Sequence, residues 1–255
     1  MYQKKNVTCI IPTRDEAKAI GLVIQGLKAL HNEDGSPIID VILVCNNGST
    51  DDTAMIAKNA GAKVVHQPQF GYGIACLTAL NHAQNSDILL FIDGDNAFRA
   101  TQAIPLINAV AMGADLAVGS RNLGCMARGA ITLPQRWGNW LASQLIQFLW
   151  HQKVTDLGPF RAISQQALKQ LAMEDKRFGW TIEMQIKAIQ MNMLVEEHPV
   201  DTFNRLGRSK ISGTVRGTIG AGVGILSMIA KLRWRQLRYG TPSLTDSSQY
   251  RGKTL

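Results

Sequence analysis

Short apolar runs and longer amphipathic stretches alternate along the first half of the chain. Nearly continuous apolar runs predict strands at 7–12, 40–46, 62–67, 87–93 and 115–121. Apolar residues at helical spacing predict helices at 15–30, 49–61, 73–84 and 100–113, the last of them broken near Pro105. Strands that are apolar on both sides and alternate with helices are typical of parallel sheets. The pattern therefore predicts an α/β fold with a mostly parallel central sheet covered by helices on both faces.

Polar residues interrupt this pattern at the carboxyl ends of four predicted strands. They are Thr13–Glu16, Asn46–Asp51, Asp93–Asp95 and Ser120–Arg121. The carboxyl ends of parallel strands share one edge of the sheet, and ligands of open α/β sheets bind there. Four polar groups on a shared edge are stronger evidence for a binding site than any one of them alone.

The second half of the chain has a different character. Its predicted elements are a helix at 134–152, a turn followed by a helix at 156–172, a helix at 179–192 and a strand at 194–204. A Gly/Ser/basic loop and an apolar, basic segment follow. We expect one domain over 1–215, an amphipathic basic segment over 216–239 and a disordered tail over 240–255.

Composition indicates an ordinary globular protein. At 255 residues the chain is long enough to bury roughly three quarters of its unfolded surface. No run approaches the roughly 18 apolar residues of a membrane span, and no secretory signal pattern opens the sequence. The four cysteines are scattered without metal-ligand spacing, and none of the five histidines lies beside a serine or cysteine motif. A reduced, cytosolic chain is therefore expected.

The net charge of +8 is concentrated at the C-terminal end. From Arg205 onward there are ten Lys or Arg residues and one acid, Asp246, so that segment carries +9 and residues 1–204 carry −1. A local excess of this kind indicates an acidic partner, such as a phosphate, nucleic acid or anionic lipid.

Asp93 and Asp95 end a buried apolar run, with Gly94 between them. Two carboxylates at a strand end can hold Mg²⁺ or Mn²⁺, which neutralises a diphosphate, and glycine lets a ligand approach the backbone. The alternative is a strand-ending turn, because Asp-Gly and Asp-Asn are common turn formers. The position after the fourth strand of an α/β pattern favours the metal and nucleotide interpretation.

The polar groups after the first two strands have structural alternatives as well. Glu16 or Asp15 could hold a ribose hydroxyl or a base edge, while Thr13 and Asp15 could cap the following helix. Asn46 and Asn47 could hydrogen-bond a nucleobase, or form an Asx turn that leads into a helix cap. Taken alone, the second motif favours the turn.

Three basic groups are candidates for binding an anion. Arg121 follows a strand. The motif "GPFR" puts Arg161 in the first turn of a predicted helix, where a guanidinium and a helix N-terminus together form an anion site. The loop 205–210 contains three cations, a glycine and a serine, and can fold over a diphosphate. Solvated arginines and a flexible loop are the alternatives.

Two segments are candidates for contact with a membrane surface. The 134–152 helix is expected to place six apolar residues broadly on one side: Trp137, Trp140, Leu141, Leu145, Phe148 and Leu149. Residues 218–230 are apolar and are followed by four cations and Trp234. Apolar residues beside Lys, Arg and Trp suit a helix in the headgroup region. Core packing against the sheet is the alternative for both segments, and the face of a homo-oligomer is a further alternative for the second.

Several of these motifs together resemble glycosyltransferase family 2, whose members use nucleotide sugars and have a GT-A fold. They are, in chain order, "IIPTRDEA", "VCNNGSTDDT", "GYGIACLTALNHA", "FIDGDNAF", "VGSR", "DLGPFRAI" and "RLGRSKISG". The resemblance covers about residues 6–215, and within the family the chain looks like the polyprenyl-phosphate sugar synthases, such as dolichyl-phosphate mannose and glucose synthases. It implies a GT-A-type nucleotide-sugar-binding fold with a catalytic domain over 1–215.

The resemblance also implies roles for individual residues. The nucleotide sugar would contact Pro12, Arg14, Glu16, Asn47, Asp93, Arg205 and Ser209, and Asp93 and Asp95 would hold Mg²⁺ or Mn²⁺. Arg121 and Arg161 would bind the acceptor phosphate, and Lys210 would close with Arg205 and Ser209 over the donor diphosphate. The catalytic set implied in this way is Asp95, Arg121, Arg161 and Lys210.

The chain departs from the family pattern at three points. Asn47 stands where relatives usually have an aspartate that reads the base, which leaves the donor's base open. Asn96 and Ala97 follow Asp95 where relatives often supply a glutamine to the metal site, so the metal would keep an extra water or Asn96 would substitute. Many relatives also carry C-terminal membrane spans, and this chain has none, so 218–238 would be its main hold on a bilayer.

The expected activity is metal-dependent transfer of glucose or mannose, with inversion, from UDP-glucose or GDP-mannose to a polyprenyl phosphate. Positioning and electrostatics would carry catalysis, and the protein would lie at the cytoplasmic face of the membrane. A family member with a soluble acceptor is the main alternative. A sugar-1-phosphate nucleotidyltransferase would need a Gly-rich basic loop where this chain has "TRDEA". A non-enzymatic membrane or nucleic-acid protein would leave four polar strand ends unexplained, so no nucleic-acid partner is expected.

Overall fold

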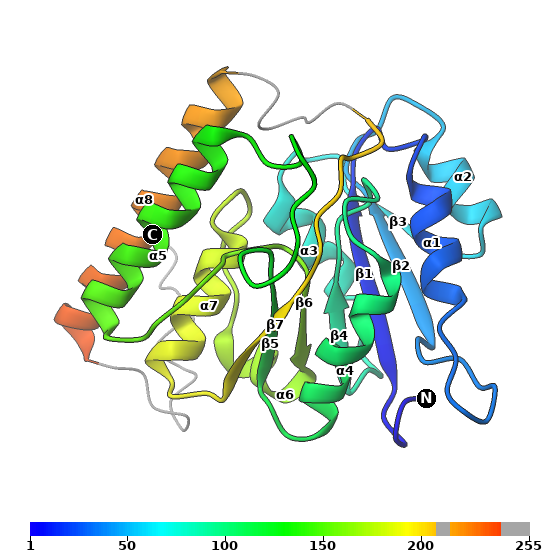
Figure 1. Cartoon of the computed structure of the whole chain (residues 1–255), viewed down its shortest axis with the longest axis horizontal. Helices are drawn as coiled ribbons and strands as arrows, with labels where there is room; N and C mark the ends of the chain where they lie inside the picture. The colour runs from blue at the N-terminus through cyan, green and yellow to red at the C-terminus, as the bar shows by residue number, and fades with distance from the viewer. Residues whose placement is uncertain (208–214, 241–255) are drawn as a thin grey trace.

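The computed structural model describes residues 1–207 and 215–240, and a seven-stranded sheet lies at its centre (Figure 1). The strands are β1 (Val7–Thr13), β2 (Val41–Asn46), β3 (Lys63–His66), β4 (Ile88–Phe91), β5 (Leu116–Ser120), β6 (Arg161–Ser164) and β7 (Val195–Pro199). Their order across the sheet is β3-β2-β1-β4-β6-β5-β7. Only β6 runs antiparallel to its neighbours, and the other adjacent pairs are parallel. The predicted mostly parallel sheet is confirmed.

Helices cover both faces of this sheet. They are α1 (Ile20–Lys28), α2 (Thr53–Asn59), α3 (Tyr72–Leu80), the short 3₁₀ helix η1 (Ala100–Gln102), α4 (Ala103–Ala111), α5 (Leu133–Trp150), α6 (Gln165–Leu171), α7 (Trp180–Gln190) and α8 (Val215–Tyr239). One buried apolar cluster lies between the sheet and α1, α2 and α4, and another lies between the sheet and α3, α6 and α7. Coverage on both faces is why β1 and β4 are buried at every residue and read as continuous apolar runs.

A third apolar cluster lies away from the sheet, among α5, α7 and α8. Met228, Ile229 and Leu232 of α8 are buried in it, together with Ala142 and Ile146 of α5. The two long helices lie side by side outside α7 (Figure 1). The amphipathic basic segment expected over 216–239 falls within α8, which packs against α5 and α7.

The first helix begins later than predicted. Asp15 has φ +50°, a conformation that does not continue into a helix, and α1 starts only at Ile20 without a side-chain cap. The carboxylate of Asp15 instead accepts a hydrogen bond from the backbone N–H of Thr50, at 2.7 Å. The predicted capping of this helix by Thr13 and Asp15 is wrong, because the next loop uses Asp15.

Proline does not break the fourth helix. Pro105 is the third residue of α4, and backbone N–H groups in the first turn have no partner within the helix. The irregularity lies before the proline, where η1 forms a tighter turn that leads into α4.

The segment 156–172 contains a strand that the sequence pattern did not predict. Residues Arg161–Ser164 form β6, which fits between β4 and β5 and pairs with both, and α6 follows it. Because β6 is antiparallel, its first residues lie at the sheet edge where the parallel strands end. The expected helix N-terminus at Arg161 is therefore wrong, although this arginine does lie at the predicted edge.

Candidate active site

The order of the strands sets the order of the polar groups along one edge of the sheet. Asn47 follows β2, Arg14 and Glu16 follow β1, Asp93 and Asp95 follow β4, and Arg121 follows β5. The residues before β6 lie between the last two groups. Motifs that are far apart in the sequence therefore form a row from the β2 end to the β5 end.

A cavity of about 540 Å³ runs along this edge. Eight of the eleven predicted site residues line it: Pro12, Arg14, Glu16, Asn47, Asp93, Asp95, Arg121 and Arg205. The structure adds lining residues that the sequence did not indicate, among them Phe70, Arg177, Phe178, Thr181 and Ala221. Ala221 belongs to α8, so the C-terminal helix contributes to the wall of the same cavity. Ser209 and Lys210 lie outside the described residues.

The two loops at the β1–β2 end are linked to each other. The Ser49 hydroxyl accepts from the backbone N–H of Asp15, and the Thr53 hydroxyl accepts from that of Glu16, at 2.9 and 2.8 Å. Asn46 Oδ1 accepts from the backbone N–H of Ser49, three residues further on, and this bond closes the turn after β2. These bonds fix the positions of Arg14 and Glu16 relative to the β2 loop.

Asp93 and Asp95 lie in the middle of the row. Burial, followed by repulsion from Asp95, raises the pKa of Asp93 to about 7, and Arg205 opposes this shift. Arg205 Nη1 lies 3.2 Å from Asp95 Oδ2. A divalent cation would relieve the repulsion between two hard oxygen donors, so the residues present fit Mg²⁺ or Mn²⁺. Within the part of the chain that the structure describes, no group of three or more His, Cys, Asp or Glu residues gathers, so a diphosphate and water would complete the ligand set.

Asn96, the residue that the sequence offered as a substitute metal ligand, lies in the turn after Asp95. It has φ +59° and lines a second, mainly apolar cavity behind the strand end, next to Phe98 and Leu206. The cavity that Asp93 and Asp95 line does not include it.

Asn47 is committed to the backbone of a neighbouring loop. Its Nδ2 donates to the carbonyls of Gln67 and Gln69, at 3.0 and 2.7 Å, and its Oδ1 accepts from the backbone N–H of Gly71, at 2.9 Å. These bonds use both amide hydrogens and one face of the carbonyl. The Asn47 side chain thus holds the loop that carries Phe70.

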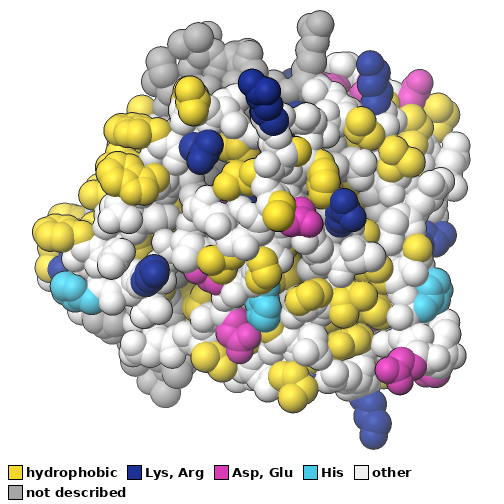
Figure 2. Space-filling view, in the orientation of Figure 1, with side chains coloured by type: hydrophobic (Ala, Val, Ile, Leu, Met, Phe, Trp, Pro, Cys, Tyr) yellow, Lys and Arg dark blue, Asp and Glu magenta, His cyan; other side chains and the backbone are white. Residues whose placement is uncertain are grey.

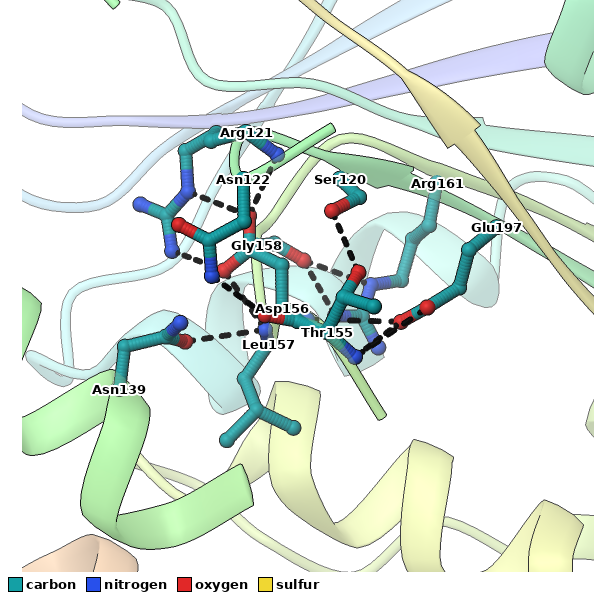
Figure 3. Close-up of polar contacts among 10 residues, drawn as sticks. All are labelled: Ser120, Arg121, Asn122, Asn139, Thr155, Asp156, Leu157, Gly158, Arg161 and Glu197. Carbon is teal, nitrogen blue, oxygen red and sulfur yellow. Dashed lines mark hydrogen bonds and ion pairs between the residues drawn. The ribbon is translucent and has the colours of Figure 1, made fainter. Parts of the chain in front are cut away.

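At the β5 end, Asp156 fixes the guanidinium of Arg121 (Figure 3). Asp156 Oδ2 accepts from the backbone N–H and from Nε of Arg121, at 2.8 and 2.7 Å, and Oδ1 accepts from Nη2 at 2.6 Å. Burial alone would lower the pKa of Arg121, but the hydrogen bonds and charge of the fully buried Asp156 outweigh it and raise that pKa. Two of the three guanidinium nitrogens are held, which leaves Nη1 for a ligand in the cavity.

The loop that carries Asp156 is tied to three elements (Figure 3). Asn139 of α5 accepts from the backbone N–H of Leu157 at 3.1 Å, and Glu197 of β7 accepts from that of Thr155 at 2.9 Å. The hydroxyls of Thr155 and Ser120 are 2.6 Å apart. Asp156 is not among the predicted site residues, although it is the first residue of the motif "DLGPFRAI".

Arg161 lies beneath this loop and does not line the cavity. Its side chain is fully buried, and its guanidinium donates to the carbonyl oxygens of Gly158 and of Thr181, the latter at 2.9 Å. Burial lowers its pKa to about 10, still far above neutrality, so the buried group stays charged. In this position Arg161 supports the Gly158–Pro159 turn.

A loop over 172–179 forms the wall opposite the sheet edge. The carbonyl groups of Lys176 and Arg177 accept from the backbone N–H groups of Ile74 and Gly73 at the start of α3. The Arg177 side chain is exposed and lines the cavity, and no carboxylate among the described residues lies within ion-pair distance of it. Nothing in "KRFGW" distinguished Arg177 from a solvated cation, because only the fold brings this loop to the cavity.

Two long helices beside this wall expose apolar side chains. Trp137, Trp140 and Phe148 of α5 and Trp234 and Leu237 of α8 are more than half exposed. Figure 2 shows hydrophobic side chains gathered along the left edge of the molecule, over α5 and α8. Across residues 1–207 and 215–240, none of the helices combines the length and apolar character that a bilayer crossing requires.

The predicted distribution of apolar residues on α5 is only partly correct. Leu145 and Leu149 face the third apolar cluster, whereas the aromatic residues named above face solvent. The cations of α8 are also partly engaged within the fold. Arg235 and Lys231 lie 2.9 and 3.5 Å from the carboxylate of Glu174, in the wall loop.

Comparison with known proteins agrees with this geometry. The family model described as "Glycosyl transferase family 2" matches residues 8–172. A glycosyltransferase of Mycobacterium tuberculosis without an assigned substrate is 31% identical over 218 residues, which are 84% of this chain and 93% of that protein. The undecaprenyl-phosphate mannosyltransferase of Micrococcus luteus is 27% identical over 247 residues, 91% of this chain and 97% of that protein.

Solved structures show the same fold. The glucosyl-3-phosphoglycerate synthase of Mycobacterium tuberculosis, in complex with Mn²⁺, UDP and glucosyl-3-phosphoglycerate, matches with a TM-score of 0.68 and 21% identity. The match covers 89% of this chain and 81% of that one. The expected GT-A fold is confirmed by this likeness.

Proposed function

The chain belongs to glycosyl transferase family 2, and from that premise we propose that it transfers a hexose from a UDP- or GDP-sugar to the phosphate of a polyprenol. The family makes it a hexosyltransferase, and the proposal concerns its donor and acceptor. The observation that carries the proposal is the order of groups along the sheet edge. One cavity contains, in order, the polar loops after β2 and β1, the carboxylates of Asp93 and Asp95, and the oriented guanidinium of Arg121.

The donor is proposed to occupy the β2 side and the middle of the row. Asp93 and Asp95 would hold a divalent metal, which supplies positive charge to the diphosphate leaving group when it is bound. Arg205 lies beside Asp95 and can bind a diphosphate oxygen. Ser209 and Lys210 follow it in the sequence, and we propose that they close over the same diphosphate.

The acceptor phosphate is proposed to lie at the β5 end. A phosphate is already anionic at neutral pH, so the chain needs no strong general base, and orientation supplies most of the catalysis. Arg121 Nη1 is available at this end, and Arg177 lines the same cavity from the wall loop. We propose that these two cations hold the phosphate in line with C1 of the sugar. Direct displacement in this geometry inverts the anomeric configuration. Arg161 acts on this site only through the turn that it supports.

The exposed faces of α5 and α8 support a lipid acceptor over a soluble one. Trp137, Trp140 and Trp234 lie on two helices that pack against each other, and α8 also lines the cavity through Ala221. Tryptophans beside cations suit the headgroup region of a bilayer. We propose that these faces hold the protein peripherally at the cytoplasmic side of the membrane, where the polyprenol phosphate can enter.

A soluble phosphorylated acceptor is the second candidate. Arg121 and Arg177 would recognise a phosphate regardless of what carries it, and the similar solved structure contains glucosyl-3-phosphoglycerate. That likeness is at 21% identity and supports the fold rather than the substrate. The exposed aromatic faces would have no role in transfer to a soluble acceptor.

A transfer assay separates these candidates. The full chain is incubated with Mn²⁺, radiolabelled UDP-glucose or GDP-mannose, and vesicles that contain undecaprenyl phosphate, and the lipid is then extracted. We expect label in the lipid phase that disappears when undecaprenyl phosphate is omitted. Label that reaches only aqueous products, such as glycosylated 3-phosphoglycerate in a parallel reaction, would refute the lipid acceptor.

Vesicle co-sedimentation tests the membrane face. Trp137→Ser combined with Trp234→Ser should reduce binding to anionic vesicles by about 10-fold or more, because each change removes a large apolar contact. Met112→Ser is the matched control, since Met112 is 74% exposed and lies on neither α5 nor α8. Equal binding by the double variant and the control would contradict the proposed face.

A further inference from the structure

An exposed aromatic ring and a guanidinium are stacked at the β1–β2 end of the cavity. Phe70 is 58% exposed and lines the cavity, and the guanidinium carbon of Arg14 lies 3.9 Å from the centre of its ring. Arg14 Nε has no hydrogen-bond partner, and its closest carboxylate, that of Asp15, is 3.8 Å away. The pair therefore presents a flat surface to the cavity.

The protein holds Phe70 in this exposed position with several specific contacts. Gly48 has φ +70°, and a Cβ at this position would lie 2.7 Å from Phe70 Cε1, so only glycine leaves room for the ring. On the other side of Phe70, a Cβ at Gly71 would lie 2.1 Å from the carbonyl oxygen of Lys176. The loop is thus enclosed between the β2 turn and the wall loop, and the ring has little freedom to leave the cavity.

Asn47 completes this support. It donates to two carbonyls and accepts from one N–H group in the segment Gln67–Gly71, on both sides of Phe70. A carboxylate at this position could not donate to either carbonyl and would be repelled by both. The amide is therefore chemically suited to holding the loop, and its hydrogens are already used there.

We infer that the Arg14–Phe70 pair is the surface on which the nucleobase of the donor stacks, and that Asn47 is a positioning residue for this surface rather than the group that reads the base. The inference rests on the proposed use of a nucleotide sugar. Every nucleobase has a flat π face, and stacking on an aromatic side chain changes affinity by about 5- to 150-fold per base. Stacking of this kind is tolerant of base identity.

This assignment predicts a specific pattern for variants. A group that reads base edges changes the ratio of UDP to GDP affinity when it is altered, because the two bases present different donors and acceptors. A residue that only holds the stacking surface weakens both nucleotides by the same factor. Asn47→Asp should therefore weaken UDP and GDP equally, and Phe70→Ala should do the same.

Calorimetric titration of the full chain with UDP, GDP and pyrophosphate, each with Mn²⁺, tests the inference. Phe70→Ala should weaken binding of the tighter nucleotide by at least about 5-fold and leave pyrophosphate unchanged, because pyrophosphate has no base. Phe70→Trp should restore nucleotide binding, since it keeps an aromatic face. Met112→Ala, an exposed residue outside the cavity, is the matched control.

The outcomes separate this inference from the proposed function. If the wild type binds a nucleotide and Phe70→Ala binds it equally well, the stacking surface is wrong while the donor class stands. If Asn47→Asp folds and changes the ratio of UDP to GDP affinity, Asn47 reads the base and the positioning role is wrong. If the wild type binds neither nucleotide, the proposed donor fails and this inference fails with it.

Discussion

Replacing Lys187 with methionine should destabilise the fold by about 3–5 kcal/mol, because it leaves the carboxylate of Glu183 buried without its counter-charge. The two side chains are 0% and 1% exposed, and Lys187 Nζ lies 2.7 Å from Glu183 Oε1. Burial lowers the pKa of Lys187, and the charge of Glu183 opposes that shift. Methionine keeps the volume of the side chain, so the change isolates the charge.

The structure shows what the lost ammonium would leave behind. Lys187 Nζ donates to the carbonyl oxygens of Leu171 and Ala172, at 2.9 and 2.8 Å, which would lose their partner. Among the described residues, the backbone N–H groups of Glu174 and Asp175 would still donate to the Glu183 carboxylate. These bonds secure the start of the wall loop at the cavity.

Thermal unfolding measures the effect. For a chain of this size each kcal/mol corresponds to about 2–4 °C, so Lys187→Met should lower Tm by about 6–20 °C. Lys169→Met on the exposed surface of α6 is the control and should change Tm by no more than about 2 °C. The double variant Lys187→Met with Glu183→Gln should unfold at a higher temperature than Lys187→Met alone, because no charge then stays buried and unpaired.

Two results would refute this reasoning. A Tm for Lys187→Met within about 2 °C of the wild type would mean that leaving the Glu183 carboxylate without its counter-charge costs little at this position. If the stability losses of Lys187→Met and Glu183→Gln add up to the loss in the double variant, the two side chains do not interact despite the short distance between them.

Three further changes test the site itself. Asp156→Asn should lower kcat by about 100-fold with little change in UDP affinity, because Arg121 loses its fixed orientation. Steady-state kinetics measures kcat and calorimetry measures UDP affinity, and a similar loss in both would contradict a role limited to orienting Arg121. Asp95→Ala should remove the stabilisation that Mn²⁺ and UDP together give in a thermal shift assay, and near-normal transfer by this variant would make the metal assignment wrong. Arg177→Ala should raise KM for polyprenyl phosphate by about 10-fold, as expected for the loss of one charge-assisted hydrogen bond. Lys176→Ala on the same loop should leave this KM unchanged. Equal effects of the two changes would mean that the loop acts through its overall positive charge rather than through a contact made by Arg177.

The strong local patterns predicted the fold well. Buried strands such as β1 and β4 are apolar at every position because helices cover both faces, and that signal is present in any one short window. The strand β6 was missed because four residues that begin with a buried arginine look like the approach to the following helix. Its position between β4 and β5 depends on pairing with segments more than forty residues away in sequence.

The site shows the same division. Eight predicted residues line the cavity, because the carboxyl ends of parallel strands must share an edge once the alternation of strands and helices is known. Phe70 and Arg177 could not be recognised, since their exposure on a cavity wall has no signature in their own neighbourhood. Asp156 needed the fold to show that its carboxylate faces Arg121.

The sequence by itself determined the α/β alternation, the family motifs and the carboxylates after β4, because each depends on neighbouring residues or on one repeating pattern. Only the tertiary structure decided how individual side chains are used. Asn47 and Arg161 both matched binding motifs, yet one holds a loop and the other supports a turn. A side chain has a limited number of hydrogen-bond donors, and long-range contacts determine whether those donors are spent inside the fold or left for a ligand.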